Sequence, residues 1–307
     1  MLLFQWLVRE DTMKIRVSIA TASLLNLKNY KIDAKPKTLY FLLPEKCKGA
    51  CGYCYIRKGY LARVRWPKFE FIEVIKKIKD GIAQRICIQT TYNENTFNLL
   101  KKIAYDINAN IPISVSINPM DYEKLIELKK AGIERIGFGI DACSQRIFNK
   151  WKKNVPSWDE YIKALKNAKK IFGNATAHLI IGLGESDEEV IKIMKILSKN
   201  GIDIALFAYT KNGETMVDLP RYRIIQISRF FIKEAKFSFE NGKIKEIYVP
   251  YIDSKSFETS GCPNCNRPFY NERVTKIYNY PYELNENEFR NAIKEAEKYA
   301  KIYIIDK

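Results

Sequence analysis

The chain has 307 residues, of which 47% are hydrophobic and 28% charged, and its 52 Lys and Arg against 35 Asp and Glu give a net charge of +17. This composition excludes a disordered or fibrous chain and predicts a globular protein with one main domain and small additions. The charge leaves three explanations open: a polyanionic partner such as RNA, an acidic carrier protein, or the Lys/Glu-rich surface of a thermophilic protein. Basic residues are scattered along the chain without a dense arm, which favours the surface explanation, with an acidic protein partner second.

The opening segment MLLFQWLV is apolar apart from Gln5, but Arg9, Glu10 and Asp11 follow it without a small-residue cleavage site. A secretory signal is therefore not expected, and the segment is interpreted as an N-terminal staple or as an upstream start ahead of Met13. No apolar run is long enough to cross a bilayer. Seven cysteines without an export signal predict metal or redox chemistry rather than disulfides, in a reducing cytoplasm.

Residues 1–37 are interpreted as a lead-in segment, which ends at Lys35-Pro36-Lys37 because proline interrupts a helix there. Over residues 38–236, short apolar runs alternate with stretches of helical periodicity. The expected strands are 38–43, 85–89, 111–117, 134–140, 176–183 and 202–209, and the expected helices are 69–82, 95–107, 121–131, 159–171, 186–199 and 222–236. Six successive βα units predict an α/β fold with a parallel sheet, a partial (β/α)6 barrel whose ligand-binding residues lie at the C-terminal ends of the strands.

The pattern changes after residue 236. Residues 237–283 are aromatic and are expected to be loop-like, and they contain the run TSGCPNCNRPFYNE from Thr259 to Glu272. Residues 286–301 are expected to form a charged helix. The sequence thus predicts a barrel over 38–236 and a C-terminal extension over 237–307.

Three cysteines at the spacing C-x3-C-x2-C follow the first expected strand: Cys47, Cys51 and Cys54. Thiolates are the protein ligands of iron–sulfur clusters, and three of them instead of four leave one iron of a [4Fe–4S] cluster open. The alternatives are a structural zinc site, which favours paired C-x2-C knuckles and four ligands, or three thiols buried by chance. The expected strand before the loop and helix after it favour the cluster.

The cysteine spacing resembles the signature of the radical S-adenosylmethionine (SAM) superfamily, whose core is a partial (β/α)6 barrel. In that family SAM chelates the open iron through its amino and carboxylate groups. An electron from the cluster splits SAM into methionine and a 5′-deoxyadenosyl radical, which abstracts hydrogen from an unactivated carbon. The resemblance therefore implies that Cys47, Cys51 and Cys54 hold the cluster and are required for catalysis.

The resemblance also implies which residues contact the adenine of SAM. Tyr53 stands where the superfamily places an aromatic residue whose backbone contacts the adenine. Ile180 and Ile181 would pack against the same ring. The run Gly182-Leu183-Gly184-Glu185 occupies the place of a family motif, although glycines also simply end strands.

Further contacts are expected at the other strand ends. Asp141 would accept both ribose hydroxyls, or else cap the helix that follows it. The remaining expected SAM contacts are Ser116, Asn118 and Tyr209. His178, the only histidine, lies inside an apolar strand, which favours a hydrogen-bonded structural role.

A second thiol pair, Cys262 and Cys265 in C-P-N-C, cannot complete a cluster alone. Cys87 is the best candidate for a third ligand, because it is expected at the end of the second strand and hence at the barrel mouth. Cys143 is less favoured. The fourth position would belong to a non-cysteine ligand: Ser260, Arg267 or a bound sulfide. The alternative is half of a zinc knuckle, although the sequence holds no second half.

Several segments extend the resemblance beyond the cysteine motif: RVSIATA, DAKPKTLYFL, RVRWP, ICIQ, SVSINP, HLIIGLGESDEE, YRIIQISRFF, TSGCPNCNRPFYNE and IYNYP. Over about residues 14–283 they resemble the biotin-synthase-related radical SAM proteins of archaea, a group that includes the paired subunits of the two-component lipoyl synthase. Biotin synthase itself is similar through the barrel and has a second-cluster cysteine where Cys87 stands. Its other two barrel cysteines align with Ser116 and Thr176, which argues against a true biotin synthase.

The resemblance implies a sulfur-inserting enzyme in which Cys87, Cys262 and Cys265 hold an auxiliary iron–sulfur cluster whose sulfide is consumed. The expected enzyme is a lipoyl synthase subunit acting on an octanoyl-lysyl carrier protein, and the alternative is a biotin-synthase-like or other radical SAM sulfurtransferase. Expected partners are an acidic lipoyl carrier protein or its peptide, a sister radical SAM subunit, and an electron donor such as ferredoxin. A membrane is not expected, and RNA is disfavoured because no added RNA-binding domain is visible. The rival from another class is a zinc-ribbon or cluster-carrying scaffold without turnover.

Overall fold

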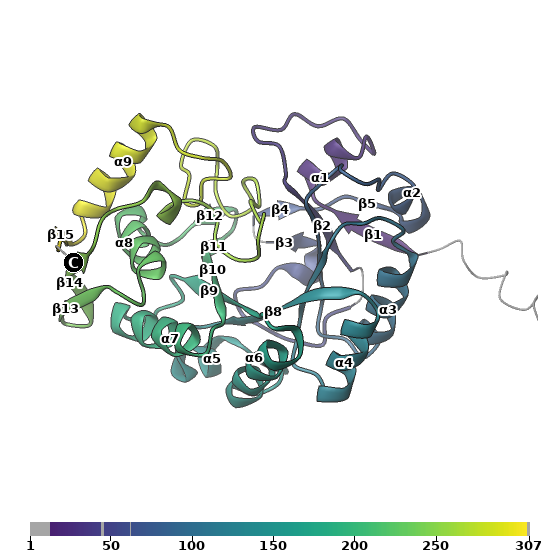
Figure 1. The fold of residues 1–307 in the computed structure, drawn as a ribbon, viewed down its shortest axis with the longest axis horizontal. Coiled ribbons are helices and arrows are strands. Elements are labelled where there is room, and N and C mark those ends of the chain that lie inside the picture. Colours follow the sequence, from purple (N-terminus) through teal and green to yellow (C-terminus); the bar gives the residue numbers. More distant parts are fainter. Residues whose placement is uncertain (1–12, 44–45, 62, 306–307) are drawn as a thin grey trace, which may run out of the picture.

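The computed structural model describes residues 13–43, 46–61 and 63–305, so the apolar opening segment lies outside the described residues. Its main sheet has eight strands in the order β10-β9-β8-β7-β6-β2-β1-β5 (Figure 1). The six parallel strands are β2 (Thr38–Leu42), β6 (Arg85–Gln89), β7 (Ile113–Ile117), β8 (Ile133–Asp141), β9 (Thr176–Ile181) and β10 (Asp203–Ala208). They correspond to the six expected strands, which confirms the partial (β/α)6 barrel.

Helices cover the outer face of this sheet (Figure 1). They are α3 (Thr96–Asp106), α4 (Tyr122–Lys130), α6 (Trp158–Phe172), α7 (Asp187–Lys199) and α8 (Leu219–Phe230). The alternation of side chains along β9 shows why the barrel forms. Leu179 and Ile181 are fully buried in the core, whereas His178 and Ile180 line a central cavity. Because side chains alternate across a strand, the apolar set faces the helices and the other set faces inward.

Capping boxes fix where two of these helices begin. Ser157 accepts a hydrogen bond from the Glu160 amide at the start of α6, and Ser186 accepts one from the Glu189 amide at the start of α7. In both cases the glutamate side chain accepts in return from the backbone amide of the cap residue, which satisfies two amides of the first turn. The expected starts of these helices were therefore close to the observed ones.

The sheet extends further on the N-terminal side than the sequence predicted. β1 (Lys14–Val17), followed by α1 (Ile19–Leu24), pairs antiparallel with both β2 and β5 (Lys68–Glu70). The expected helix over 69–82 is wrong in its length, since only α2 (Phe71–Ile75) is helical. The backbone of residues 68–70 pairs with β1 instead, a long-range contact that overrides local helical periodicity.

Short elements surround the barrel opening and were not foreseen. They are η1 (Ile56–Lys58), the hairpin of β3 (Tyr60–Leu61) and β4 (Val64–Arg65), α5 (Gln145–Trp151), and the hairpin of β11 (Thr210–Lys211) and β12 (Glu214–Thr215). Each is too short to show a periodic pattern.

The expectation that residues 237–283 are loop-like is wrong for their first part. β13 (Lys236–Glu240) and β14 (Lys243–Val249) form a hairpin around Asn241-Gly242, and β15 (Lys301–Ile304) adds a parallel third strand. Both turn residues have positive φ, 51° and 76°, as the Asn-Gly pair allows. This Asn-Gly dipeptide between apolar runs was the overlooked signal. The division of the chain at residues 37 and 236 stays a prediction.

After η2 (Ser254–Ser256) the chain returns to the barrel, and α9 (Glu286–Glu297) then lies beside α8 (Figure 1). Arg223 of α8 connects the barrel to the C-terminal extension. Its guanidinium pairs with Glu295 of α9 at 2.8 Å and donates to the carbonyls of Ile277 and Tyr278. Within the described ranges, no helix has both the length and the apolar character that a bilayer span requires.

We expect Arg223→Met to lower the free energy of unfolding by about 3 kcal/mol, because it removes a buried cation and leaves its partners unpaired. The Arg223 side chain is 1% exposed. Urea denaturation followed by circular dichroism measures the loss. The control is Arg290→Met, which breaks an exposed pair with Glu286 and should cost less than about 1 kcal/mol. Equal losses in both variants would contradict the proposed anchoring role of Arg223.

Candidate active site

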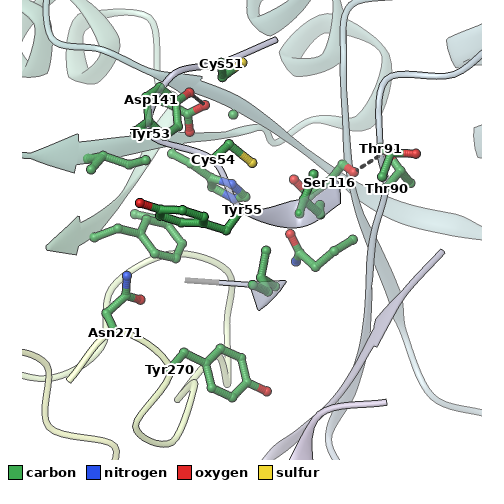
Figure 2. A pocket seen from close by; sticks show the side chains of 18 of the residues that line it. Cys51, Tyr53, Cys54, Tyr55, Thr90, Thr91, Ser116, Asp141, Tyr270 and Asn271 are labelled. Carbon is green, nitrogen blue, oxygen red and sulfur yellow. Dashed lines mark hydrogen bonds between the residues drawn. The ribbon is translucent and has the colours of Figure 1, made fainter. Parts of the chain in front are cut away.

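The inner faces of the strands and the loops after them enclose a cavity of about 240 Å³. All the expected cluster and cofactor residues except Ile181 line this cavity: Cys47, Cys51, Tyr53, Cys54, Cys87, Ser116, Asn118, Asp141, Ile180, Tyr209, Cys262 and Cys265. Figure 2 shows Cys51, Cys54 and Asp141 on one side, with Tyr270 and Asn271 of the C-terminal extension on the other. The structure therefore brings the predicted residues together, while the role of each stays a prediction.

The loop of the first cysteine set is held against the segment after α5. The amides of Ala50 and Gly52 donate to the carbonyls of Lys153 and Trp151 at 2.7 and 2.9 Å. A Cβ on Gly52 would lie 3.0 Å from the Trp151 ring, which is closer than most side chains approach, so this contact favours glycine. This packing presents three thiols to the cavity.

Two thiols of the first cysteine set, Cys51 and Cys54, are poor thiolates in the absence of a metal. Burial raises the pKa of Cys51, and it raises the pKa of Cys54 to about 12. A metal replaces such protons when it binds, which couples cluster binding to deprotonation. The first cysteine set therefore suits a metal centre better than free-thiol chemistry.

The arrangement suits a multinuclear cluster better than a single ion. In the part of the chain that the structure describes, no three His, Cys, Asp or Glu side chains surround the position of one metal ion. A mononuclear zinc site requires such convergence. A four-iron cluster does not, because each thiolate binds a different iron.

Asp141 ends β8 in a left-handed conformation, with a φ of 62°. Its Oδ2 accepts a hydrogen bond from the Tyr53 hydroxyl, drawn in Figure 2, and pairs with the Lys152 ammonium at 2.9 Å. The alternative role of Asp141 as a helix cap is wrong, because Ser144 caps α5 and accepts from the Ile147 amide. The carboxylate is thus fixed at the cavity wall, where the predicted ribose contact would be made.

Lys152 is a site residue that the sequence did not reveal. Its side chain is 4% exposed, donates to the Gly139 carbonyl, and has its Nζ 4.5 Å from the ring centroid of Tyr161. Burial lowers the pKa of Lys152, but the neighbouring acidic groups, led by the Asp141 carboxylate, together outweigh burial and raise this pKa above its ordinary value. Lys152 is therefore a buried cation on the cavity wall beside the first cysteine set.

The other expected SAM contacts lie along the rim. Asn118 Oδ1 accepts from the Tyr161 hydroxyl at 2.6 Å, and the Ser116 carbonyl accepts from Thr90 Oγ1 at 2.8 Å (Figure 2). Ile180 lines the cavity as expected. Ile181 is fully buried in the core on the opposite face of β9, so the pairing of both isoleucines with one ring is wrong.

The glycine run after β9 forms a closed turn. Gly182 and Gly184 have φ of 107° and 104°, which other residues rarely adopt. The fully buried Glu185 carboxylate accepts from the amides of Gly182 and Leu183, both at 2.8 Å, and pairs with Arg221 at 3.0 Å. Glu185 thus holds the shape of the loop and is not part of the cavity wall.

The second cysteine set lies at the opposite end of the cavity from the first. Cys87 is the middle residue of β6, so its expected place at the barrel mouth is wrong. The loop with Cys262 and Cys265 is tied to the first residues of three strands: Thr38 Oγ1 donates to the Asn264 carbonyl, Arg85 Nε to the Pro263 carbonyl, and Thr176 Oγ1 lies 3.5 Å from Cys262 Sγ. Cys47, Cys51 and Cys54, in contrast, follow the C-terminal end of β2.

Two residues suggested as a fourth ligand lie close to this second set. Arg267 Nη1 donates to Cys265 Sγ at 3.5 Å, and Ser260 Oγ accepts from the Leu206 amide at 2.9 Å. Burial raises the pKa of both Cys87 and Cys262. Cys143 is 2% exposed and packs in the core, which agrees with its lower rank as a ligand.

His178 does not form the hydrogen bond that the sequence suggested. Its ring packs against Phe207, with centroids 5.3 Å apart, and no hydrogen bond joins it to another described residue. Burial, followed by the positive charge of Arg267, lowers the pKa of His178 to about 4. The imidazole is therefore neutral at physiological pH.

We expect the wild type to lose up to about 3 kcal/mol more unfolding free energy than His178→Phe between pH 7 and pH 4. The unfolded chain takes up the histidine proton near its ordinary pKa of 6.5, whereas the folded chain does so only near 4, so stability falls as the pH drops through this window. The carboxylates titrate in both proteins, so their contributions to the unfolding free energy cancel when the two proteins are compared. Urea midpoints at a series of pH values measure the difference, and parallel curves would contradict it.

Comparison with known proteins identifies the class. Residues 42–220, more than half of the chain, match the model of the radical SAM superfamily, and the chain belongs to that superfamily. The FeFe-hydrogenase maturase HydG from Carboxydothermus hydrogenoformans has a similar fold, with a TM-score of 0.50 and 17% identity over 69% of this chain and 55% of that one. The superfamily implies a [4Fe–4S] cluster and SAM, and the open cavity with its three-thiol loop fits both.

The curated relatives of the chain include biotin synthases. The biotin synthase of Persephonella marina is 28% identical over 236 residues, which cover 70% of this chain and 68% of that one. The biotin synthase of Hydrogenobaculum sp. is 24% identical over 216 residues, 64% of each chain, so the likeness spans about two thirds of these relatives. Within the radical SAM superfamily, the chain is therefore similar to biotin synthases.

Proposed function

We propose that this protein is a radical SAM sulfur-insertion enzyme, and more narrowly a lipoyl synthase subunit that places sulfur on the octanoyl chain of a lysyl carrier protein. The observation that carries the proposal is the presence of two cysteine sets at opposite ends of one cavity. Cys47, Cys51 and Cys54 would hold the cluster that binds SAM, and Cys87, Cys262 and Cys265 the auxiliary cluster. When bound, the first centre with SAM supplies a hydrogen-abstracting radical, and the second supplies sulfide.

The titratable groups of the cavity support a radical reaction over acid–base chemistry. A saturated C–H bond has no acidic proton, and a general base must be free to accept one. The Asp141 carboxylate is paired with Lys152, the Tyr53 hydroxyl donates to Asp141, and burial lowers the pKa of His178 to about 4, which makes its imidazole a weak base. These groups bind and orient a cofactor better than they remove a proton.

The apolar part of the cavity lining suits an alkyl chain. It includes several apolar side chains: Ile56, Leu61, Ile117, Val155, Ala205 and Phe207. Such a lining excludes water and oxygen from a reactive carbon, which is the contribution that the barrel itself makes to the chemistry.

The partners follow from this substrate. The carrier would be an acidic lipoyl protein, attracted by the net charge of +17, so that association weakens as salt is added. A sister radical SAM subunit would complete the sulfur insertion, and a ferredoxin-like donor would supply electrons.

Sulfur insertion into another substrate is the second candidate, since the curated relatives include biotin synthases. Ser116 and Thr176 stand where the resemblance puts two barrel cysteines of biotin synthase. Cys262 Sγ lies 3.5 Å from Thr176 Oγ1. A thiol from the C-terminal extension thus lies beside one position where a barrel cysteine is missing, so the extension would supply that ligand here.

Mass spectrometry of an octanoylated carrier peptide tests the proposal. The reconstituted protein is incubated anaerobically with SAM and dithionite, with and without a sister subunit, and a parallel arm contains dethiobiotin. Thiolated peptide is the expected product, with about eight irons bound per chain for two [4Fe–4S] clusters. Thiolated dethiobiotin alone would favour the second candidate. Release of 5′-deoxyadenosine without thiolation in any arm would contradict sulfur insertion.

A further inference from the structure

Tyr40 lies on the inner side of β2, between the two cysteine sets. It is 1% exposed and lines the cavity, and its backbone pairs with that of Cys87 on the neighbouring strand. Its ring packs edge-on against Tyr270 with centroids 5.2 Å apart. These rings belong to a small separate core formed by Tyr40, Leu42, Trp66 and Tyr270, against which Cys87 and Cys265 pack.

The Tyr40 hydroxyl has a defined set of partners. It accepts hydrogen bonds from the amides of Asn266 and Arg267, at 2.9 and 2.8 Å. It donates to Cys265 Sγ at 3.5 Å. A phenol has one proton and two acceptor positions, so with both acceptor positions filled by amides the proton is directed at the sulfur.

The two amides depend on this hydroxyl because of the backbone around Cys265. Asn264 and Arg267 have φ of 64° and 31°, so the chain turns sharply and directs the amides after Cys265 into the core. A buried amide without an acceptor is costly. Tyr40 therefore fixes the conformation of the segment that carries Cys265, in addition to contacting its sulfur.

We propose that Tyr40 is a positioning residue for the second cysteine set and that its hydroxyl raises the reduction potential of the auxiliary cluster. This inference rests on the proposed function, since it requires that Cys87, Cys262 and Cys265 hold a cluster. A hydrogen bond donated to a ligand sulfur stabilises negative charge there, and the reduced cluster carries more of it. The same strand thus delivers the first cysteine set at its C-terminal end and controls the second from its middle.

The test uses a full-length background in which Cys47, Cys51 and Cys54 are all replaced by alanine, so that only the second site can hold iron. Tyr40→Phe keeps the ring and removes the hydroxyl. The matched control is Tyr270→Phe, because the buried Tyr270 hydroxyl donates no hydrogen bond to a cysteine sulfur in the described structure. Iron and sulfide are counted, and the midpoint potential is measured by redox titration with electron paramagnetic resonance.

We expect a lower midpoint potential in Tyr40→Phe than in the background, and no shift in Tyr270→Phe. If Tyr40→Phe loses the cluster, incorporation of 2,3-difluorotyrosine at position 40 provides a second measurement. Its more acidic hydroxyl is a stronger donor, so the potential should rise. Equal potentials in the background, Tyr40→Phe and Tyr270→Phe would overturn the role of Tyr40 while leaving the cluster intact. Where Tyr40→Phe has lost the cluster, equal potentials in the background and the difluorotyrosine protein would overturn it. A background that binds no iron would overturn the proposed auxiliary site itself, and the role of Tyr40 with it.

Discussion

Replacing Cys54 with alanine is expected to reduce the release of 5′-deoxyadenosine by at least about a hundredfold. Mutation of a residue that only hydrogen-bonds to a metal ligand already lowers metal affinity or activity about 10–100-fold, and Cys54 is expected to be a ligand itself. Cys54 is one of the three thiols in the C-x3-C-x2-C loop, and the described segment between β2 and β6 holds no other cysteine. Without it the site offers two ligands. The iron content should fall from about eight to about four per chain, because only the second cluster stays.

Chromatography of reactions with SAM and dithionite measures the nucleoside, and a ferrozine assay measures the iron. Cys143→Ala is the matched control, because this thiol is buried in the core and does not line the cavity. It should retain both clusters and the release of 5′-deoxyadenosine. Wild-type release by Cys54→Ala would show that the C-x3-C-x2-C loop does not hold the reactive cluster.

The barrel was predictable because its local and global signals agree. β6 was expected over 85–89 and is observed there, since an apolar β-branched run has no competing helical period. The start of α7 follows from Ser186 and Glu189, which satisfy the first-turn amides wherever the helix packs. Such features depend on residues a few positions apart.

The depth of the second cysteine set was not predictable in the same way. Whether a strand residue lies at the mouth or inside a barrel depends on its register with its neighbours. Cys87 stands level with Tyr40 and Ser114 because of the pairing of β6 with β2 and β7. The position of Cys262 and Cys265 depends on contacts such as that of Thr38 with Asn264, which are 226 residues apart.

The role of Lys152 could not be predicted from the sequence either. The stretch after Asn149 contains Lys150, Lys152 and Lys153, and no local property distinguishes them. Lys153 is exposed, whereas Lys152 is buried against Asp141. Only the packing of α5 against the first cysteine loop selects one of the three, so the buried cation of the cavity wall becomes visible only in the folded chain.

Replacing Cys262 with alanine is expected to separate the two halves of the reaction. SAM cleavage should stay near the wild-type rate, because the two cysteine sets are far apart along the strands. Cys262 lies beside the first residue of β9, whereas the C-x3-C-x2-C loop follows the C-terminal end of β2. Thiolation of the carrier peptide should fall by at least about a hundredfold. Loss of a residue that only contacts a metal ligand costs up to about a hundredfold, and loss of the ligand itself should cost at least as much. The two products are quantified in the same anaerobic reaction.

Thr176→Val is the matched control for this separation. It removes the hydroxyl 3.5 Å from Cys262 Sγ and keeps every thiol, so thiolation should fall by no more than about a hundredfold, as for other outer partners of metal ligands. In both variants, iron counts distinguish loss of the auxiliary cluster from slower sulfur transfer by a cluster that is still bound. Because one cavity connects the two cysteine sets, loss of the sulfur source should leave a radical generated beside an unreacted chain, and 5′-deoxyadenosine should accumulate without product. Thiolated peptide from Cys262→Ala would contradict the assignment of the C-P-N-C pair as ligands of the sulfur source.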